Sequence, residues 1–244
     1  MTAWLGLFRS LAIYHNPVTL RAWRRFYREI LSPGDLAFDV GAHVGTRARA
    51  MRASGARVVA LEPQAPFARF LRHTLPRDVI LLEVAAGPAT ATADLAVSSR
   101  HPTVSSLRAD FVADAPRAAG FEHVLWDRTQ RVQVVTLDAL FARFGQPAYL
   151  KIDVEGFEID VLRGLSRAVP MISVEYLPAF PHLTRAVIDR LLELGPYRFN
   201  PVAGETGRFL WPDWRDAAAL RAWLDELPPD ATSGDVFARL PEPG

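Results

Sequence analysis

The stretch LAFDVGAHVG, residues 36–45, decides the fold. A short strand-like run leads into a turn with glycines at 41 and 45, and a helical pattern follows over residues 45–54. Glycine lets a backbone turn sharply and approach a ligand closely, and the first turn of a helix has free N–H groups. The stretch therefore predicts a strand–turn–helix unit that binds a nucleotide-like ligand. Its Gly-x-x-x-Gly spacing differs from the Gly-x-Gly-x-x-Gly of dinucleotide-binding enzymes.

Asp39, two residues before Gly41, bears on which ligand binds at this turn. A carboxylate here repels a pyrophosphate but attracts the ammonium and sulfonium charges of S-adenosylmethionine. Asp39 thus favours S-adenosylmethionine as the cofactor over NAD. The alternative is a structural carboxylate that only ties the loop.

Glu62 ends the next predicted strand, RVVALEP (57–63), and lies 21 residues after Gly41. An acid at about this distance can accept hydrogen bonds from both ribose hydroxyls of an adenosine ligand. Dinucleotide enzymes share this feature, so Glu62 supports an adenosine ligand rather than the methyl donor in particular. The alternative is a carboxylate that caps the strand end.

Strand-like and helix-like segments alternate from residue 35 onward. This pattern predicts an α/β fold, a doubly wound and mostly parallel sheet with helices on both faces. Further strands are expected at 78–87, 131–137, 148–154 and 171–176, and an antiparallel edge hairpin at 197–202 and 207–211. Helices are expected at 64–75, 138–144, 183–194 and 214–226, with another ending near Gly164. The stretch 88–130, with a strand at 92–98, is a candidate lid or substrate loop.

The segment KIDVEGFE (151–158) supplies the candidate catalytic residues. Lys151, the sole lysine of the sequence, and Asp153 occupy alternate positions of a central strand, so both point to the same side of the sheet. Open α/β sheets place their ligands at the carboxyl ends of such strands. We therefore predict a cluster of Lys151, Asp153 and Glu155 in the cleft. The alternative is a structural ion pair with Glu155 as a helix cap.

A base that takes a proton from the acceptor would lie in this cluster. Asp153, Glu155 or a neutral Lys151 could fill this role, and His101 is an outside candidate from the predicted lid. A metal-assisted version would use Asp153, Glu155 and Glu175 as oxygen ligands for magnesium. The prediction itself includes no metal.

DVGAHVG, VVALEP, VTLDAL and LKIDVEGFEIDVLRG, in this order and spacing, resemble the FkbM family of S-adenosylmethionine-dependent methyltransferases over about residues 35–176. The resemblance implies the class I methyltransferase fold and O-methylation of a hydroxyl on a sugar or natural-product small molecule. It also implies that Asp39, Gly41, Gly45 and Glu62 line the cofactor site. We add Ala42 and His43 from the same turn and Asp153 from the cluster in the cleft. The family commonly has asparagine where this chain has His43, and a histidine can still hydrogen-bond the cofactor. HPTVSSL (101–107) resembles a stretch of the family's middle insertion.

Three segments follow from these patterns: an amphipathic helical extension (1–34), the methyltransferase domain (35–212), and a C-terminal helix with a loose tail (213–244). Apolar and arginine side chains alternate at helical spacing in the extension. This indicates helices packed on the domain; the alternative is a membrane-surface contact or a homo-oligomer contact.

Composition further limits the class of protein to which this chain can belong. A net charge of +1 gives no overall attraction to nucleic acid. The absence of cysteine excludes a disulfide scaffold and a thiolate site. No apolar run is long enough for a transmembrane segment and no signal-peptide pattern is present, so we expect a cytoplasmic protein. Two other classes remain open: a non-catalytic partner protein with this fold, and an NAD-dependent oxidoreductase.

Overall fold

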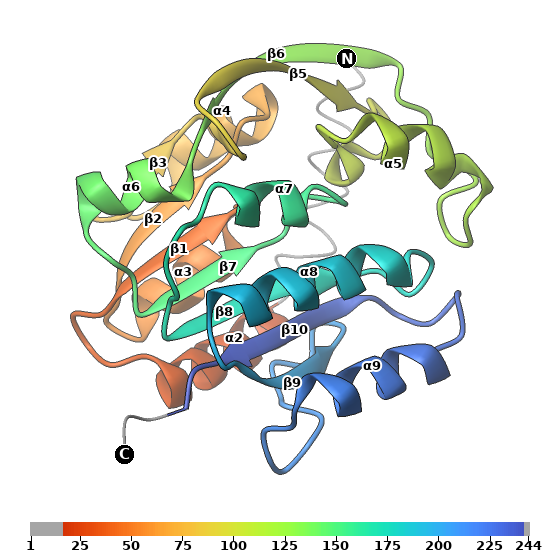
Figure 1. Ribbon diagram of the computed structural model, residues 1–244. Helices are drawn as coiled ribbons and strands as arrows, with labels where there is room; N and C mark the ends of the chain where they lie inside the picture. Colours follow the sequence, from red (N-terminus) through yellow and green to blue (C-terminus); the bar gives the residue numbers. More distant parts are fainter. Residues whose placement is uncertain (1–16, 242–244) are drawn as a thin grey trace.

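A computed structural model describes residues 17–241. Their main sheet has seven strands in the order β3-β2-β1-β7-β8-β10-β9 (Figure 1). The strands are β1 (Leu36–Val40), β2 (Arg57–Leu61), β3 (Ile80–Leu82), β7 (Tyr149–Ile152), β8 (Met171–Tyr176), β9 (Arg198–Ala203) and β10 (Gly234–Arg239). The first five in sheet order pair in parallel, and β10 runs antiparallel to both β8 and β9. The predicted fold class, mostly parallel with an antiparallel edge, is confirmed.

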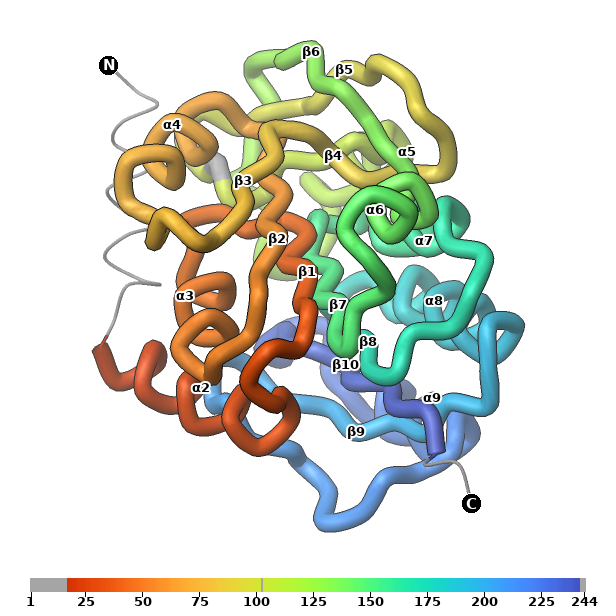
Figure 2. The backbone as a smooth tube through the Cα atoms, turned by 90° about the vertical axis from the view of Figure 1, so that its left-hand side faces the viewer, coloured from red at the N-terminus to blue at the C-terminus, as the bar shows by residue number. Residues whose placement is uncertain are grey.

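Helices cover both faces of this sheet, as Figure 2 shows. On one side lie α2 (Pro17–Ile30), α3 (Thr46–Ala53) and α4 (Ala65–Thr74), and on the other α6 (Leu137–Phe144), α7 (Glu158–Arg163), α8 (Pro181–Leu194) and α9 (Ala217–Glu226). A parallel sheet needs this double cover because its strands are apolar on both faces. All five residues of β1 are buried accordingly.

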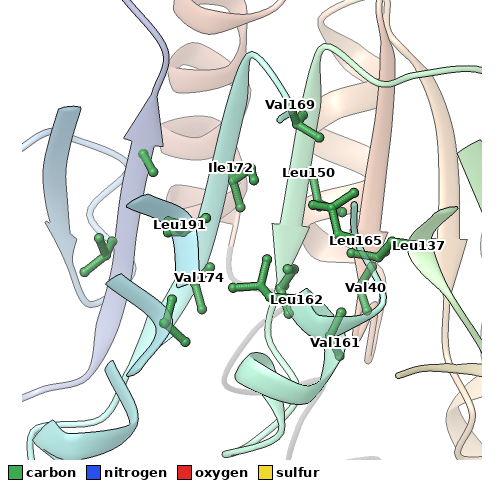
Figure 3. Close-up of a cluster of buried hydrophobic side chains, with 14 of the residues drawn as sticks. Val40, Leu137, Leu150, Val161, Leu162, Leu165, Val169, Ile172, Val174 and Leu191 are labelled. Carbon is green, nitrogen blue, oxygen red and sulfur yellow. The ribbon is translucent and has the colours of Figure 1, made fainter. Parts of the chain in front are cut away.

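The core on the α6–α9 side is mostly aliphatic, and Figure 3 shows part of it. Leu150 and Ile172 project from β7 and β8 toward Leu162 and Leu191 of the covering helices, and all four are fully buried. Burial of each such side chain contributes about 1.5–3 kcal/mol. This layer fixes the carboxyl ends of the central strands in place.

The opposite face of the sheet, toward α2 and α3, differs because charged residues alternate with its apolar ones. Asp39, Lys151 and Asp235 are buried and occupy positions alternating with Ala37, Tyr149 and Phe237, which belong to the core on this side. Side chains two residues apart on a strand share a face. The charges therefore gather under α2 and α3, at the end of the sheet where the site lies.

A smaller sheet, in the order β4-β6-β5, lies above the main one. Its strands are β4 (Ala85–Ala86), β5 (Ala91–Val97) and β6 (Arg128–Val135). The predicted strand 78–87 is thus two strands in different sheets. Between β5 and β6 the chain forms η1 (Pro102–Val104), α5 (Ala109–Asp114) and η2 (Ala115–Arg117), which occupy the predicted lid region.

The predicted edge hairpin is wrong in its second strand. Residues 207–211 form irregular backbone with bends, and β9 pairs instead with β10, residues 234–239, from the segment expected to be a loose tail. Phe209 packs its ring against Phe26 and Phe237, with centroids 4.9 and 5.4 Å away. The apolar residues of 207–211 therefore serve a side-chain contact and not a strand pairing.

Helix α2 confirms the second half of the predicted helical extension. Trp23, Phe26 and Tyr27 are buried against the sheet and α3, so its apolar side is covered by the chain's own domain. The first half, residues 1–16, lies outside the described residues. The alternative for the whole extension, a membrane-surface or dimer contact, stays a prediction. Within residues 17–241, no helix has both the length and the apolar character that crossing a membrane requires.

Candidate functional site

A cavity of about 370 Å³ follows the carboxyl edge of the main sheet. Its wall begins at the ends of β2 and β1, passes the end of β7 and reaches β8, β10 and the turn after β9. This is the edge at which open α/β sheets bind their ligands. Gly41, Ala42, His43, Glu62, Lys151, Asp153 and Glu155, all predicted site residues, line it together.

Gly41 brings two loops into contact at the centre of this wall. Its φ angle is +84°, in the region that glycine adopts freely. A Cβ atom added there would lie 1.8 Å from the backbone oxygen of Asp153. The turn after β1 and the end of β7 therefore touch through a position that admits no side chain.

Glu62 is held by backbone donors from both sides. The N–H of His43 donates to Oε2 at 2.7 Å, and the N–H of Gln64 donates to Oε1 at 2.8 Å. Burial raises the pKa of Glu62 to about 8, because these two hydrogen bonds only partly offset the loss of water. The carboxyl group thus faces the cavity in a fixed orientation with capacity to accept further hydrogen bonds.

The cavity wall on the Glu62 side contains several apolar side chains. They come from the β1–α3 turn, α4, the residue before β4, β5 and the lid: Val44, Phe67, Val84, Leu95 and Leu107. A flat aromatic ring system is the kind of group that such a wall buries favourably. This end of the cavity therefore combines an apolar surface with a hydrogen-bonding carboxyl group.

Lys151 is ion-paired on two sides. Its Nζ lies 2.8 Å from Asp153 Oδ2 and 3.8 Å from Asp39 Oδ1, and its side chain is 2% exposed. Burial alone would lower the pKa of Lys151, but the Asp153 and Asp39 carboxylates raise it above its ordinary value. Lys151 is therefore protonated, which argues against the neutral Lys151 considered as a base.

The two aspartates respond differently to the same lysine. Burial raises the pKa of Asp39 to about 6, although Lys151 and Arg47 oppose this shift. Burial acts the same way on Asp153, but the adjacent ammonium of Lys151 holds its pKa below the ordinary value. Asp153 is thus the ionised carboxylate at the cavity surface, and Asp39 supports the lysine from behind.

Glu155 and Glu175 complete an acidic group with Asp153. One oxygen from each of the three lies within 4.8 Å of the others. Burial and the neighbouring carboxylates raise the pKa of both glutamates well above the ordinary value. The ionised form of either glutamate is therefore a stronger base than that of an exposed glutamate, which suits a general base.

The loop that carries Glu155 is fastened by Glu158, a residue that the sequence reasoning missed. Glu158 Oε1 accepts hydrogen bonds from the N–H groups of Val154 and Gly156, both at 3.1 Å. Glu155 itself has a φ of +53°, which is uncommon for a residue with a side chain. The loop is thus held in a strained form that turns Glu155 into the cavity wall.

Three predicted residues lie outside this wall. Asp39 is fully buried behind Lys151. Gly45, with φ of +77°, precedes α3 and packs against Arg49 and Leu71. His101 lies in the lid with its ring 4.5 Å from that of His123. We predicted cofactor contacts for Asp39 and Gly45 and a base role for His101. These stay predictions, and the position of the three residues outside the cavity wall does not favour them.

The cavity wall also contains charged and polar residues that the sequence reasoning did not single out. They include Arg47, Gln64, Glu205 and Asp235. Arg47 and Asp235 meet across 188 positions of the chain, a separation at which no sequence spacing signals a contact. Gln64 could have been predicted as a site residue from the sequence, since it follows Glu62 by two residues.

A family model described as the methyltransferase FkbM domain matches residues 39–200, more than half of the chain. The chain belongs to the FkbM methyltransferase family. Membership supports methyl transfer as the general activity of this FkbM member. The match includes Gly41, Glu62, Lys151, Asp153 and Glu155 but ends before Glu205 and Asp235.

Solved structures similar to this FkbM member include a precorrin-6y C5,15-methyltransferase from Geobacter metallireducens GS-15, with 18% identity, a TM-score of 0.44, and coverage of 92% of this chain and 86% of the other. A predicted O-methyltransferase from Agrobacterium tumefaciens has 14% identity, a TM-score of 0.41, and coverage of 89% and 79%. A ribosomal protein L11 methylase from Lactobacillus delbrueckii subsp. bulgaricus has 11% identity, a TM-score of 0.43, and coverage of 93% and 81%. No curated protein matches the sequence.

Divalent cations are expected to leave the stability of this FkbM member unchanged. The ammonium of Lys151 already lies 2.8 Å from Asp153 and supplies the positive charge that a cation would bring to this acidic group. Thermal melting in EDTA and in millimolar magnesium or manganese chloride would measure this. A bound ion raises the melting temperature by mass action. A metal-induced rise that Glu175→Gln removes would contradict the expectation.

Proposed function

We propose that this FkbM member is an S-adenosylmethionine-dependent O-methyltransferase that acts on a hydroxyl of a sugar or natural-product small molecule. The observation that carries the proposal is one cavity that joins the Gly41 turn, the fixed carboxyl group of Glu62 and the Lys151–Asp153 pair. Family membership supports the methyl transfer. The cytoplasm stays the proposed location, on the sequence alone.

The residues present fit S-adenosylmethionine. Glu62, whose backbone donors leave lone pairs available, can accept hydrogen bonds from both ribose hydroxyls. The apolar wall beside it suits the adenine ring. Asp153, the ionised carboxylate in the wall, offers attraction to the positively charged amino-acid end of the cofactor.

When bound, S-adenosylmethionine supplies a methyl group that is already activated for displacement. The protein then has two tasks: to hold the acceptor oxygen in line and close, and to take the hydroxyl proton. We assign proton removal to the carboxylate of Glu155, which lies in the cavity wall and whose raised pKa makes its ionised form a stronger base. Lys151 keeps Asp153 ionised and in place through their 2.8 Å contact.

Replacement of Glu62 by alanine is expected to weaken binding of S-adenosylmethionine by more than about tenfold, because it removes a charged hydrogen-bonding group from the ribose. Calorimetric titration of wild type and variant with S-adenosylmethionine and with NAD measures this. Glu83→Ala is the matched control, since Glu83 is partly exposed and pairs only with Arg72 among the described residues. A folded wild type that binds neither compound would favour the non-catalytic partner, and binding of NAD alone would favour the oxidoreductase.

Binding of S-adenosylmethionine is also expected to release a fraction of a proton at pH 7. Glu62 has a pKa of about 8 in the free protein, so it is largely protonated there. Ribose hydroxyls donate to the ionised form and lower this pKa. Calorimetry in two buffers of different ionisation enthalpy measures the release, which fades above pH 9 because Glu62 is then already ionised. Equal binding enthalpies in both buffers at pH 7 would contradict this assignment.

A further inference from the structure

The end of the cavity opposite Glu62 is built by β9 and β10. Its wall contains Gly204 and Glu205 from the turn after β9 and residues 232–235 at the start of β10, together with Arg47 from the first turn of α3. Gly234 pairs with both Tyr176 and Ala203, so all these segments meet at the same edge of the sheet. Most of them lie outside the family match, which ends at residue 200.

Arg47 holds this end together. Its Nη2 donates to Asp235 Oδ2 at 3.0 Å and to Glu205 Oε1 at 3.3 Å. Its guanidinium carbon lies 3.0 Å from the centroid of the Trp23 ring, and Trp23 Nε1 donates to Glu205 Oε2 at 2.7 Å. The guanidinium is therefore stacked and hydrogen-bonded at once, a geometry that arginine can make and lysine cannot.

The position of this cluster places it beyond the methyl donor. In the sheet order, β2 with Glu62 and β10 with Asp235 are separated by β1, β7 and β8. Four strand spacings correspond to about 19 Å. With the ribose at Glu62 and the charged end of the cofactor at Asp153, the β10 side of the cavity is left for the acceptor.

The chemistry of this end favours hydroxyl groups. One guanidinium and two carboxylates carry a net charge of −1, which repels an anionic acceptor. Arg47 contacts both Asp235 and Glu205, so an ammonium group on the ligand would compete with the guanidinium for these carboxylates. Ser233 and Thr232 in the same wall add hydroxyl groups. A hydroxyl both donates and accepts, so it can bind between such groups without a charge of its own.

We propose that Arg47, Glu205 and Asp235 form an acceptor subsite for a neutral, polyhydroxylated ligand, with Trp23 as a positioning residue that holds Arg47. This assignment rests on the proposed function, because it presumes that the methyl donor occupies the Glu62 end. Adjacent hydroxyls of the ligand bind to the carboxylates as donors and to the arginine as acceptors.

Saturation-transfer NMR with neutral hexoses and 6-deoxyhexoses, in the presence of S-adenosylhomocysteine, tests the subsite. Arg47→Lys keeps the charge beside Asp235 but loses the planar fork, and Glu205→Gln changes a half-exposed side chain. Each is expected to weaken binding of a responding sugar at least about tenfold, as loss of a charged hydrogen bond does. The affinity for S-adenosylmethionine, measured by calorimetry, stays that of the wild type.

Two matched control variants distinguish this result from a nonspecific effect of substitution on folding. Arg52→Lys lies on the same helix, with Arg52 exposed and paired with Asp78, and Glu83→Gln repeats the charge loss at another exposed pair. Both controls are expected to bind the sugar as the wild type does.

Three results would overturn the subsite. Loss of affinity for S-adenosylmethionine in Arg47→Lys or Glu205→Gln would assign the cluster to the methyl donor. Normal binding of S-adenosylmethionine by the wild type with no response to any neutral sugar would refute the ligand class alone. A wild type that does not bind S-adenosylmethionine would remove the proposed function, and the subsite with it.

Discussion

Replacement of Lys151 by methionine is expected to destabilise the fold by about 3–5 kcal/mol, the cost of breaking a buried ion pair from one side. The methionine fills similar space, so the loss is electrostatic and not a cavity. Asp39, at 0% exposure, would keep its buried carboxylate but lose its nearest counter-charge. Chemical denaturation of wild type and variant measures the difference.

A second substitution tests the cause of this loss. In the double variant Asp39→Asn with Lys151→Met the uncompensated charge at position 39 is gone, so part of the lost stability is expected to return. Full additivity of the two single effects would show that the residues do not interact, and would contradict the ion pair.

The loss of folding stability in Lys151→Met, relative to the wild type, is expected to grow with pH. Asp39 already has a pKa of about 6 in the folded wild type, above its value of 3.8 when unfolded. Without Lys151 this folded pKa rises further, so the folded variant binds a proton that the unfolded chain releases. Such a group contributes stability at low pH that is lost as pH rises through the folded pKa. Denaturation at pH 5 and pH 8 compares the two conditions, and an equal deficit at both would exclude Asp39 as its source.

Replacement of Gly41 by alanine is expected to abolish binding of the methyl donor and to lower stability by several kcal/mol. The new Cβ would lie 1.8 Å from the Asp153 oxygen and 2.9 Å from its carbonyl carbon. Both are backbone atoms, so the turn after β1 and the end of β7 must separate. Left-handed backbone alone costs alanine about 1–2 kcal/mol, and the collision adds to it.

The variant Gly34→Ala separates the cost of the left-handed backbone from the cost of the collision. Gly34 has a φ of +92° with nothing within 4 Å of an added Cβ, so it bears the backbone cost without the collision. Calorimetry and thermal melting of both variants are expected to show a small loss of stability and normal binding for Gly34→Ala. If Gly41→Ala bound S-adenosylmethionine equally well, the close approach to Asp153 would have no part in the site.

The parts of the site that lie at strand ends could be predicted from the sequence. Gly41, Glu62 and Asp153 each follow a run of strand-forming residues, and the carboxyl ends of neighbouring parallel strands meet at one edge. The alternation of Lys151 with Asp153 indicated a shared face, and the two side chains do meet at 2.8 Å. These inferences needed only local spacing and the rules of parallel sheets.

The acceptor end could not be predicted in this way. Residues 234–239 form β10 by pairing with both β8 and β9, and both pairings are non-local. GRFLW (207–211) has the more strand-like composition, yet its Phe209 is used in an aromatic contact. Asp235 was missed for the same reason, since a residue in an expected loose tail gives no signal of a buried ion pair with Arg47.

The position of β10 between β8 and β9 has a consequence for biosynthesis. During translation β8, β9 and α9 are synthesised before residues 234–239 exist, so strand β9 cannot join the sheet until β10 has been made. The nascent chain can assemble the Glu62 end early, because its strands are close in sequence, whereas the end that holds Asp235 forms last. A message truncated before codon 234 would thus encode a chain whose strand β9 has no neighbour, with a bare sheet edge that is prone to aggregation.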